Sequence, residues 1–348
     1  MLSDMLIRTI LKKLPSLRIG VVGDLFLDEY LEIDDTLTEP SIETGLSAYQ
    51  VTSIRHSPGA AGTILNNLAA LGVGKIHLLS FIGTDGRGHD VKKALTQRGI
   101  DVSYLLETPL RHTPTYTKPM LNKPGAPSRE LNRLDIKNRT ETPGDVQLYL
   151  YESLPRLWKD VDALLVLDQV SVAETGVITS MIRHQLAELG QSNSNKLLLC
   201  DSRERIGQFS YCWAKPNLSE CQAALNTDSM TPEQAARALA FQLQRPVFCT
   251  SGEEGIFLAA RFTHDVDCSG IQQYEVRQVP GYAVTEPIDI VGAGDSTSAG
   301  IACAFASGAS LTEAAAFGNL IASITIQQLG TTGTATPKQV WERWKQVS

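Results

Sequence analysis

Short apolar runs alternate with longer segments of helical periodicity along most of the chain, and this alternation constrains the fold more than any other feature. The apolar runs, each about the length of a buried strand, lie at 17–24, 75–83, 163–168, 196–201 and 246–250. The segments of helical periodicity lie at 63–72, 89–99, 173–190 and 231–243. Strands joined by helices pair in parallel, so the pattern predicts an α/β fold with a doubly wound, mainly parallel sheet covered on both faces.

Two segments interrupt this alternation. Residues 30–57 and 101–135 are rich in β-branched residues, proline and threonine, with patches of period-two alternation typical of strands. We expect both to form a small β-sheet lid over the strand ends, where open sheets bind ligands. Since no linker divides the chain, the sequence predicts one domain, 1–348, that carries this lid. A sheet so small covers its own outer face poorly, which favours a homodimer through the lid.

Composition and charge exclude several classes of protein. Of the 348 residues, 43% are hydrophobic and 20% are charged, which is ordinary for a folded soluble protein. A formal net charge of -7 argues against a nucleic-acid surface. No run approaches the ~20 apolar residues that span a bilayer, and Arg8, Lys12 and Lys13 break the apolar opening, unlike a signal peptide. The six cysteines include no Cys-x-x-Cys pair, which predicts reduced thiols in a cytoplasmic protein.

The stretch D-I-V-G-A-G-D at 289–295 places a glycine turn in front of an apolar run of small residues that ends near Gly308. A helix that begins in such a turn directs unpaired backbone N–H groups and the positive end of its dipole outward, which makes an anion site. Asp295 would lie in the first helical turn, as a capping residue or as a proton acceptor. Beside a phosphoryl group held by the amides of 292–294, it would accept the proton of an attacking hydroxyl.

Several further motifs occur in an order that resembles the ribokinase/PfkB family of sugar kinases along nearly the whole chain. The stretch 289–295 looks like the family signature D-T-x-G-A-G-D, with Ile290 in place of the usual threonine. Residues 217–220 look like its N-x-x-E element, and 250–255 resemble its T-x-G-x-x-G loop. Gly318-Asn319 falls where the family commonly lines the adenine pocket.

The first third of the chain carries matching motifs as well. Gly23-Asp24 with Asp28 resembles the strand-end carboxylates that hold sugar hydroxyls. Residues 58–62 resemble the first family signature, and 83–88 resemble its G-x-D-x-x-G turn.

The resemblance implies a role for each matching residue. Asp295 would be the catalytic base, and Gly292, Ala293 and Gly294 would form the anion hole. The implied substrate-binding residues are Asp24, Asp28, Gly59, Ala60, Thr63, Lys118 and Arg133. The implied nucleotide-binding residues are Asn217, Thr250, Gly252, Gly255 and Asn319. ATP would be the co-substrate, Glu220 and Asn217 would hold Mg²⁺ through water, and a monovalent cation is compatible with the family.

The nearest resemblance within the family is to heptose 7-phosphate kinases, including the kinase half of ADP-heptose synthases. The residues that carry it are 23–30, 117–118, 133–135 and 329–331. A kinase of sugar phosphates needs cations for the second phosphate, and Lys118, Arg133 and Arg203 are the candidates.

Departures from the family pattern leave the substrate open. Thr63 stands where the family has asparagine, Ala60 stands where it has glycine, and 169–175 lacks the tyrosine and Lys-Gly expected of a heptose kinase. The alternatives are a kinase of ribose, fructose, a hexose phosphate or a nucleoside, and a non-catalytic sugar or nucleotide sensor on the same fold. A dinucleotide oxidoreductase is disfavoured, because 20–28 carries acidic residues where G-x-G-x-x-G should follow.

Overall fold

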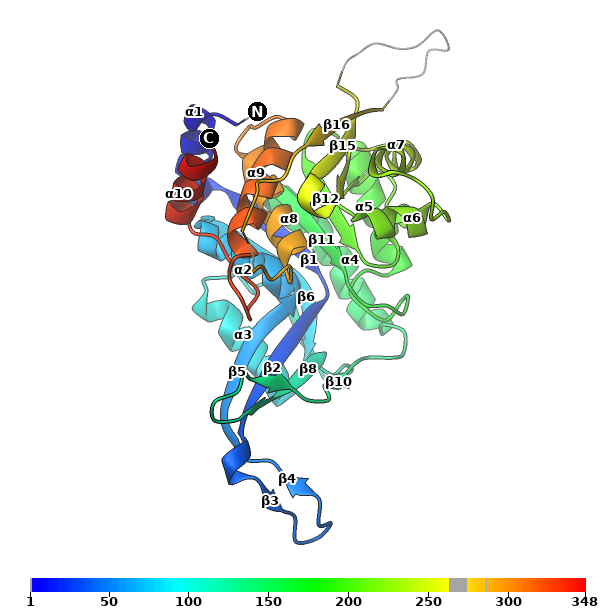
Figure 1. Cartoon of the computed structure of the whole chain (residues 1–348). Helices are drawn as coiled ribbons and strands as arrows, with labels where there is room; N and C mark the ends of the chain where they lie inside the picture. Colours follow the sequence, from blue (N-terminus) through cyan, green and yellow to red (C-terminus); the bar gives the residue numbers. More distant parts are fainter. Residues whose placement is uncertain (1, 263–273, 286) are drawn as a thin grey trace.

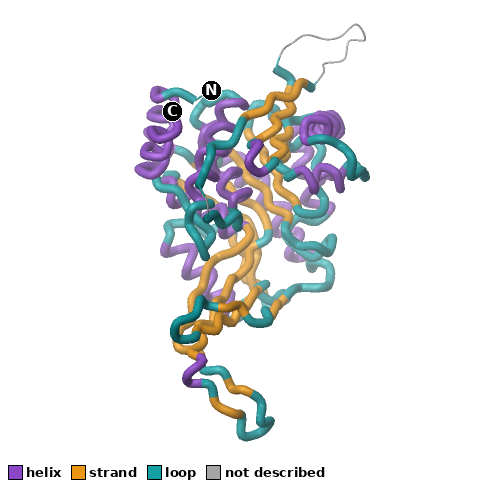
Figure 2. The backbone as a smooth tube through the Cα atoms, in the orientation of Figure 1, coloured by secondary structure: helices purple, strands orange, loops and turns teal. Residues whose placement is uncertain are grey.

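A nine-stranded sheet forms the centre of the protein (Figures 1 and 2). The computed structural model describes residues 2–262, 274–285 and 287–348. The strand order is β16-β15-β14-β13-β12-β11-β1-β6-β7. Their bounds are β1 (Arg18–Gly23), β6 (Lys75–Gly83), β7 (Leu105–Thr108), β11 (Ala163–Asp168), β12 (Leu197–Ser202), β13 (Trp213–Ala214), β14 (Val247–Thr250), β15 (Ile256–Ala260) and β16 (Glu275–Val279). The pairs from β7 to β14 are parallel, and β15 and β16 add an antiparallel edge, which confirms the predicted mainly parallel sheet.

Helices cover both faces of this sheet. The face with Val21 and Leu165 packs against α1 (Asp4–Lys13), α2 (Ala61–Leu71), α3 (Gly86–Gln97), α8 (Ala293–Ala306), α9 (Leu311–Thr325) and α10 (Pro337–Val347). The face with Val22 and Leu164 packs against α4 (Gly144–Asp160), α5 (Ser180–Ser192), α6 (Leu218–Ala224) and α7 (Pro232–Leu243). Successive residues of a strand point to opposite faces, so a sheet covered on both sides requires the continuous apolar runs seen in the sequence.

A second, smaller sheet extends from one end of the body and forms the lid (Figure 1). Its strands are β2 (Leu25–Asp34), β5 (Val51–Ala60), β8 (Thr115–Asn122), β9 (Arg129–Glu130) and β10 (Leu134–Ile136), and β3 (Glu39–Pro40) and β4 (Ser47–Ala48) form a separate hairpin. The strand β2 begins before the predicted boundary at residue 30. The strand β7 lies inside the second predicted lid segment but pairs with β6 in the main sheet, because it continues that sheet in parallel register.

Local sequence explains several helix ends. The predicted capping box of α7 is confirmed, since Thr231 and Gln234 bond reciprocally to each other's backbone N–H. The predicted helix 173–190 begins only at Ser180, because 169–179 is an irregular loop bound by side chains from other strands. The 3₁₀ helices are η1 (Leu14–Ser16), η2 (Asp35–Leu37), η3 (Ile206–Gln208) and η4 (Gly252–Glu254).

Two global features bear on the predicted class. Across the three described ranges, none of the helices is long and apolar enough to cross a membrane. The cysteines in these ranges are free and buried, namely Cys200, Cys212, Cys221, Cys249 and Cys303. Cys268 lies outside the described residues.

Candidate active site

The glycine turn at 292–294 begins α8, as the sequence predicts. Gly292 is the N-cap and has φ 80°, a left-handed conformation that favours glycine. The amide of Ala293 donates to Ile290 O at 3.1 Å within the turn, whereas the amides of Gly294 and Asp295 have no acceptor among the described residues. Of the predicted anion-hole residues 292–294, the amide of Ala293 is thus used within the turn, the amides of Gly292 and Gly294 have no acceptor among the described residues, and Asp295 offers one further amide.

Asp289 holds the loop in front of this turn. Its carboxylate accepts from the amide of Val291 at 3.0 Å and from the amide of Gly330 at 3.1 Å. Because both oxygens are occupied by backbone donors, Asp289 shapes the entrance to α8. This leaves Asp295 as the acidic side chain of the motif with no hydrogen bond among the described residues.

Asp295 lies among charges that come from neighbouring strand ends. Although the residue keeps some exposure, enclosure by protein and the negative charge of Asp201 raise the pKa of its carboxyl to about 7. Lys215 and Arg203 act in the opposite direction. A carboxyl with a pKa near neutrality and a free oxygen is suited to accept a proton at neutral pH.

Asn217 and Glu220 meet at the start of α6. Asn217 Oδ1 accepts from the amide of Glu220 at 2.9 Å, and Glu220 Oε2 accepts from the amide of Asn217 at 2.8 Å, which makes a capping box. Burial and the charge of Asp201 raise the pKa of Glu220. The second carboxylate oxygen of Glu220 has no partner in the described ranges, and these ranges contain no cluster of three or more acidic, histidine or cysteine ligands. Because Mg²⁺ keeps several waters and uses few protein ligands, this donor set fits a water-mediated Mg²⁺.

The predicted nucleotide residues lie on adjacent loops. Asn217 forms a parallel bridge with Thr250, so the N-x-x-E and T-x-G-x-x-G motifs are side by side. Gly255 has φ 84°, and a Cβ there would lie 2.2 Å from Val279 O, so only glycine fits. Asn319 is buried, and its side-chain amide donates to Val279 O at 2.9 Å, which fixes the following loop.

Lid residues and body residues meet near α8. Lys118 forms an ion pair with Asp28 at 3.0 Å. A Cβ on Gly59 would lie 2.5 Å from Asp28 Oδ2, so the carboxylate of Asp28 lies directly against this glycine. Thr63 is buried, and its Cγ2 lies 3.3 Å from where a Cβ on Gly292 would be. The predicted substrate residue Thr63, in the first turn of α2, is thus adjacent to Gly292 of the predicted phosphoryl site.

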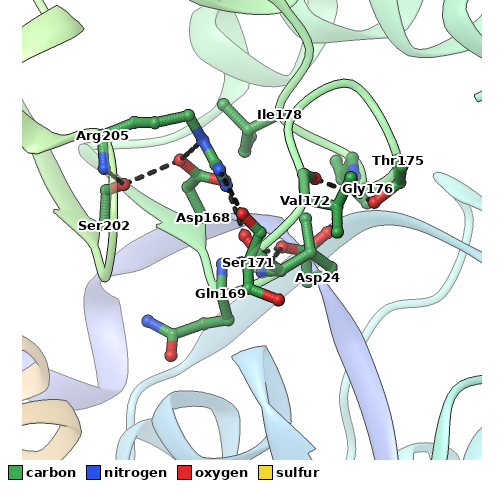
Figure 3. A network of polar contacts seen from close by, with 12 residues as sticks. Asp24, Asp168, Gln169, Ser171, Val172, Thr175, Gly176, Ile178, Ser202 and Arg205 are labelled. Carbon is green, nitrogen blue, oxygen red and sulfur yellow. Dashed lines mark hydrogen bonds and ion pairs between the residues drawn. The ribbon is translucent and has the colours of Figure 1, made fainter. Parts of the chain in front are cut away.

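Asp24, a predicted sugar ligand, is buried at the end of β1 and is one of the residues that line a cavity. Its carboxylate accepts from the amides of Gln169 at 2.8 Å, Val170 at 3.1 Å and Val177 at 2.8 Å (Figure 3). Burial, followed by the charge of Asp168, raises its pKa to about 6 despite these bonds. These bonds let Asp24 anchor the 169–177 loop, the turn-type role that acidic residues after a strand often have, and a contact with the sugar stays a prediction.

Sequence reasoning missed the second anchor of this loop, Arg205. Its guanidinium donates to Asp168 Oδ2 at 2.9 Å and to Asp168 Oδ1 at 2.6 Å, and it also reaches the carbonyls of Ser171 and Val170 (Figure 3). Ser202 completes the network by donating to Asp168 Oδ2 at 2.7 Å. No local pattern pairs these residues, because they come from the ends of different strands.

The anchored loop forms one wall of a cavity of about 150 Å³. Other parts of its wall are Tyr116 of the lid, the linker residues Lys137 and Arg139, and Arg203 after β12. Lys137 pairs with Asp135 at 3.1 Å, whereas Arg139 and Arg203 have no carboxylate partner in the described part of the chain.

The three side chains predicted to bind the second phosphate differ in whether a carboxylate already pairs with them. Lys118 is neutralised by Asp28, and Arg133 by Asp135 at 2.6 Å. Arg203 lines the cavity and is also near enough to Asp295 for its charge to lower the pKa of that carboxyl. Arg139 was not predicted, because a single arginine in a lid-to-helix linker carries no sequence signal.

Comparison with protein families and curated proteins gives consistent results. A family model described as pfkB family carbohydrate kinase matches residues 27–339. The bifunctional protein HldE of Trichlorobacter lovleyi is 27% identical over 341 residues, covering 96% of this chain and 64% of that protein. The bifunctional protein HldE of Geobacter sulfurreducens is 26% identical over 325 residues, covering 92% and 61%. The chain therefore spans less than two thirds of the length of these relatives.

Solved structures agree on the fold. Ribokinase from Arabidopsis thaliana, complexed with ribose and ATP, has a TM-score of 0.66 at 18% identity and covers 94% of this chain and 99% of its own. Phosphofructokinase-2 from Escherichia coli, in complex with potassium, has a TM-score of 0.65 at 16% identity and covers 95% and 99%. At these identities the likeness establishes a ribokinase-like fold.

Proposed function

The chain belongs to the pfkB family of carbohydrate kinases, and on that premise we propose that it transfers the γ-phosphoryl group of ATP to a hydroxyl of a sugar phosphate, with Asp295 as general base. The observation that carries this proposal is that the carboxyl of Asp295 and the amides of Gly294 and Asp295 in the first turn of α8 lie together and have no hydrogen-bond partners within the described ranges. Phosphoryl transfer depends mainly on positioning and electrostatic stabilisation, and these groups supply both.

In this mechanism each group of the chain has a separate task. Asp295 takes the proton of the acceptor hydroxyl. The hydroxyl oxygen forms a bond to the γ-phosphorus of ATP as the bond between that phosphorus and ADP breaks. The amides of Gly294 and Asp295 donate to the oxygens of the moving phosphoryl group, while the positive end of α8 stabilises their charge. Bound Mg²⁺, near Glu220, would neutralise charge on the phosphates of ATP.

The acceptor class follows from the cavity beside the proposed base. Arg139 and Arg203 face it without a carboxylate partner among the described residues, and Lys137 adds a further positive charge. Guanidinium groups bind phosphate in fork geometry, so this cavity suits the anionic group of a sugar phosphate. A heptose 7-phosphate is the first candidate, because the sequence resembles heptose 7-phosphate kinases. Ribose, fructose, hexose phosphates and nucleosides remain alternatives, since Thr63 and Ala60 depart from the family pattern.

The lid supports a proposed homodimer. Its hairpin and outer strands expose large apolar side chains, among them Leu37, Ile42, Leu46, Val51 and Ile54. Apolar side chains gathered in this way commonly mark a protein interface. Sedimentation of the purified protein tests this directly, since a monomer mass at high concentration contradicts it. The cytoplasmic location and a monovalent cation requirement stay predictions of the sequence.

A substrate panel tests the proposed function. Each sugar phosphate, beginning with heptose 7-phosphate and hexose phosphates, is compared with the same sugar without phosphate, using Mg·ATP and ADP release. We expect the phosphorylated member of a pair to have the higher kcat/KM, because the cavity binds its anionic group. Ribose, fructose and nucleosides complete the panel.

The same panel with Asp295→Asn serves as the control for contaminating kinases. Higher activity on neutral sugars than on their phosphates would contradict the assignment of the cavity to an anionic group. Saturable sugar binding with no ADP release from any compound would support the sensor alternative instead.

A further inference from the structure

Lys215 is a buried lysine at the end of β13, next to the candidate active site. It is 3% exposed, and its ammonium lies 2.9 Å from Asp201 Oδ2 at the end of β12. An ammonium group has three donors. Asp201 is the one acceptor with a defined contact to this ammonium in the described part of the chain, so donor capacity remains.

The ammonium of Lys215 points at the first turn of α8. A Cβ on Gly294 would lie 3.2 Å from Lys215 Nζ, the one described atom within 4 Å of that position outside the adjacent residues and the backbone of α8 itself. The lysine therefore lies against the turn whose amides are unpartnered. Glycine at 294 leaves the space between the ammonium and the helix backbone clear.

The charged groups around Asp295 come from four elements. Asp201 and Arg203 follow from β12, Lys215 from β13, Glu220 from α6, and Asp295 itself from α8. The ion pair with Asp201 holds the buried ammonium of Lys215 in place among these groups. A charge held at low dielectric acts on its neighbours more strongly than one at the surface.

We propose that Lys215, held in place by Asp201, is a positioning residue whose fixed positive charge supports the negative charge shared by the Asp295 carboxylate and the phosphoryl group at the first turn of α8. This inference rests on the proposed function and adds a role for two residues outside the matched motifs. A purely structural pair would use up its donors, as Arg205 does with Asp168, whereas Lys215 keeps donors beside the turn.

The test is the pH dependence of kcat/KM at fixed Mg²⁺ for wild type, Lys215→Met, Lys215→Arg and the double variant Asp201→Asn with Lys215→Met. The acid limb of the wild type should lie near pH 7, because the pKa of Asp295 is about 7. In Lys215→Met the limb should move up by about one pH unit, which lowers kcat/KM at pH 7 about fivefold by ionisation alone. Lys215→Arg should keep the limb in place.

The double variant keeps the proposal open to refutation if Lys215→Met fails to fold. It buries no unpaired charge, and since Asp201 and Lys215 act on Asp295 in opposite directions, its limb should return toward the wild type. Lys338→Met, on the exposed pair of α10, serves as the matched control. An unmoved limb in Lys215→Met together with a lower Tm, or a double-variant limb displaced from the wild type by about a full pH unit, would overturn the inference. Full turnover by Asp295→Asn would instead refute the proposed base, which separates the two failures.

Discussion

Two buried acids, Asp24 and Asp295, show how similar electrostatics accompany different tasks. Burial raises both pKa values, to about 6 for Asp24 and about 7 for Asp295. Backbone amides of the 169–177 loop donate to Asp24 at 2.8–3.1 Å, whereas Asp295 has no hydrogen bond among the described residues. A raised pKa therefore reports burial in both cases, and the free oxygen is what distinguishes a proton acceptor from an anchor.

Their neighbouring cations differ in the same way. The guanidinium of Arg205 donates hydrogen bonds to Asp168 and to two loop carbonyls. The ammonium of Lys215 has Asp201 as its defined partner in the described ranges. The Asp24 side of the molecule is thus a hydrogen-bonded network that fixes one wall of the cavity. The Asp295 side retains acceptors and donors that a substrate can use.

The largest expected effect is the loss of kcat when Asp295, the proposed proton acceptor, is replaced. Asp295→Asn keeps the shape of the side chain but removes the proton acceptor, so we expect kcat to fall by about 10²–10⁴-fold. ADP release with saturating acceptor measures it, and calorimetry should find ATP affinity nearly unchanged. A variant that turns over at the wild-type rate would remove the contrast with Asp24.

The next effect concerns stability on the Asp24 side of the molecule. Arg205→Met leaves Asp168 buried without its cation, which should lower the free energy of unfolding by about 3–5 kcal/mol. Denaturant unfolding measures this loss. Arg237→Met, at an exposed pair with Glu233, is the control and should change stability by less than about 1 kcal/mol. Equal losses in the two variants would mean that the network is not the anchor described above.

A smaller effect is expected at the cavity wall between the two regions. Arg203→Met removes charged hydrogen bonds to the anionic group of the acceptor, so KM for a sugar phosphate should rise about 10–100-fold. The KM for the unphosphorylated sugar is the internal control and should change little. If both KM values rise together, Arg203 serves the structure or the nucleotide and not the second anion.

The smallest effect is a change of stability with pH. The folded pKa of Asp295 lies above its unfolded value of 3.8, so its stabilising contribution is complete below pH 4 and is lost as the pH rises through about 7. Asp295→Asn should therefore raise stability at pH 8, by about 1–2 kcal/mol after allowance for solvent exposure, or Tm by about 2–5 °C. Thermal unfolding at pH 8 and pH 5 tests this, since the gain should be clearly smaller at pH 5 and should vanish only below about pH 4.

The matched variant Asp24→Asn should behave in the opposite way at pH 8. An amide in that position would turn an N–H group toward at least one of the loop amides that now donate to the carboxylate. We therefore expect a lower Tm. A stabilised Asp24→Asn protein would show that the loop does not depend on its hydrogen bonds.

Local features of the fold could be predicted from the sequence. The strand runs such as ALLVLD became β11, and the Thr231–Gln234 spacing became a capping box, because each depends on residues close in the chain. The helix expected at 173–190 begins later, since Asp24 and Arg205, far away in sequence, hold its first residues in a loop. The periodicity of a segment does not report hydrogen bonds to residues that are far away in the sequence.

The same division applies to the site. The glycine turn at 292–294 and the position of Asp295 in the first turn of α8 followed from the sequence, because a helix start and its unpaired amides are local properties. The pairing of Lys215 with Asp201, the cavity with Arg139 and Arg203, and the occupied state of Asp24 were not predictable.

The sequence by itself determined the alternation of strands and helices, the turn that begins α8, and the residue types that meet at the strand ends. Tertiary structure alone decided which of these carboxylates is satisfied and which is free. The reason is physical: a hydrogen bond requires donors and acceptors within about 3 Å. The donors to Asp24 are brought to it only when crossover helices align β1 with β11.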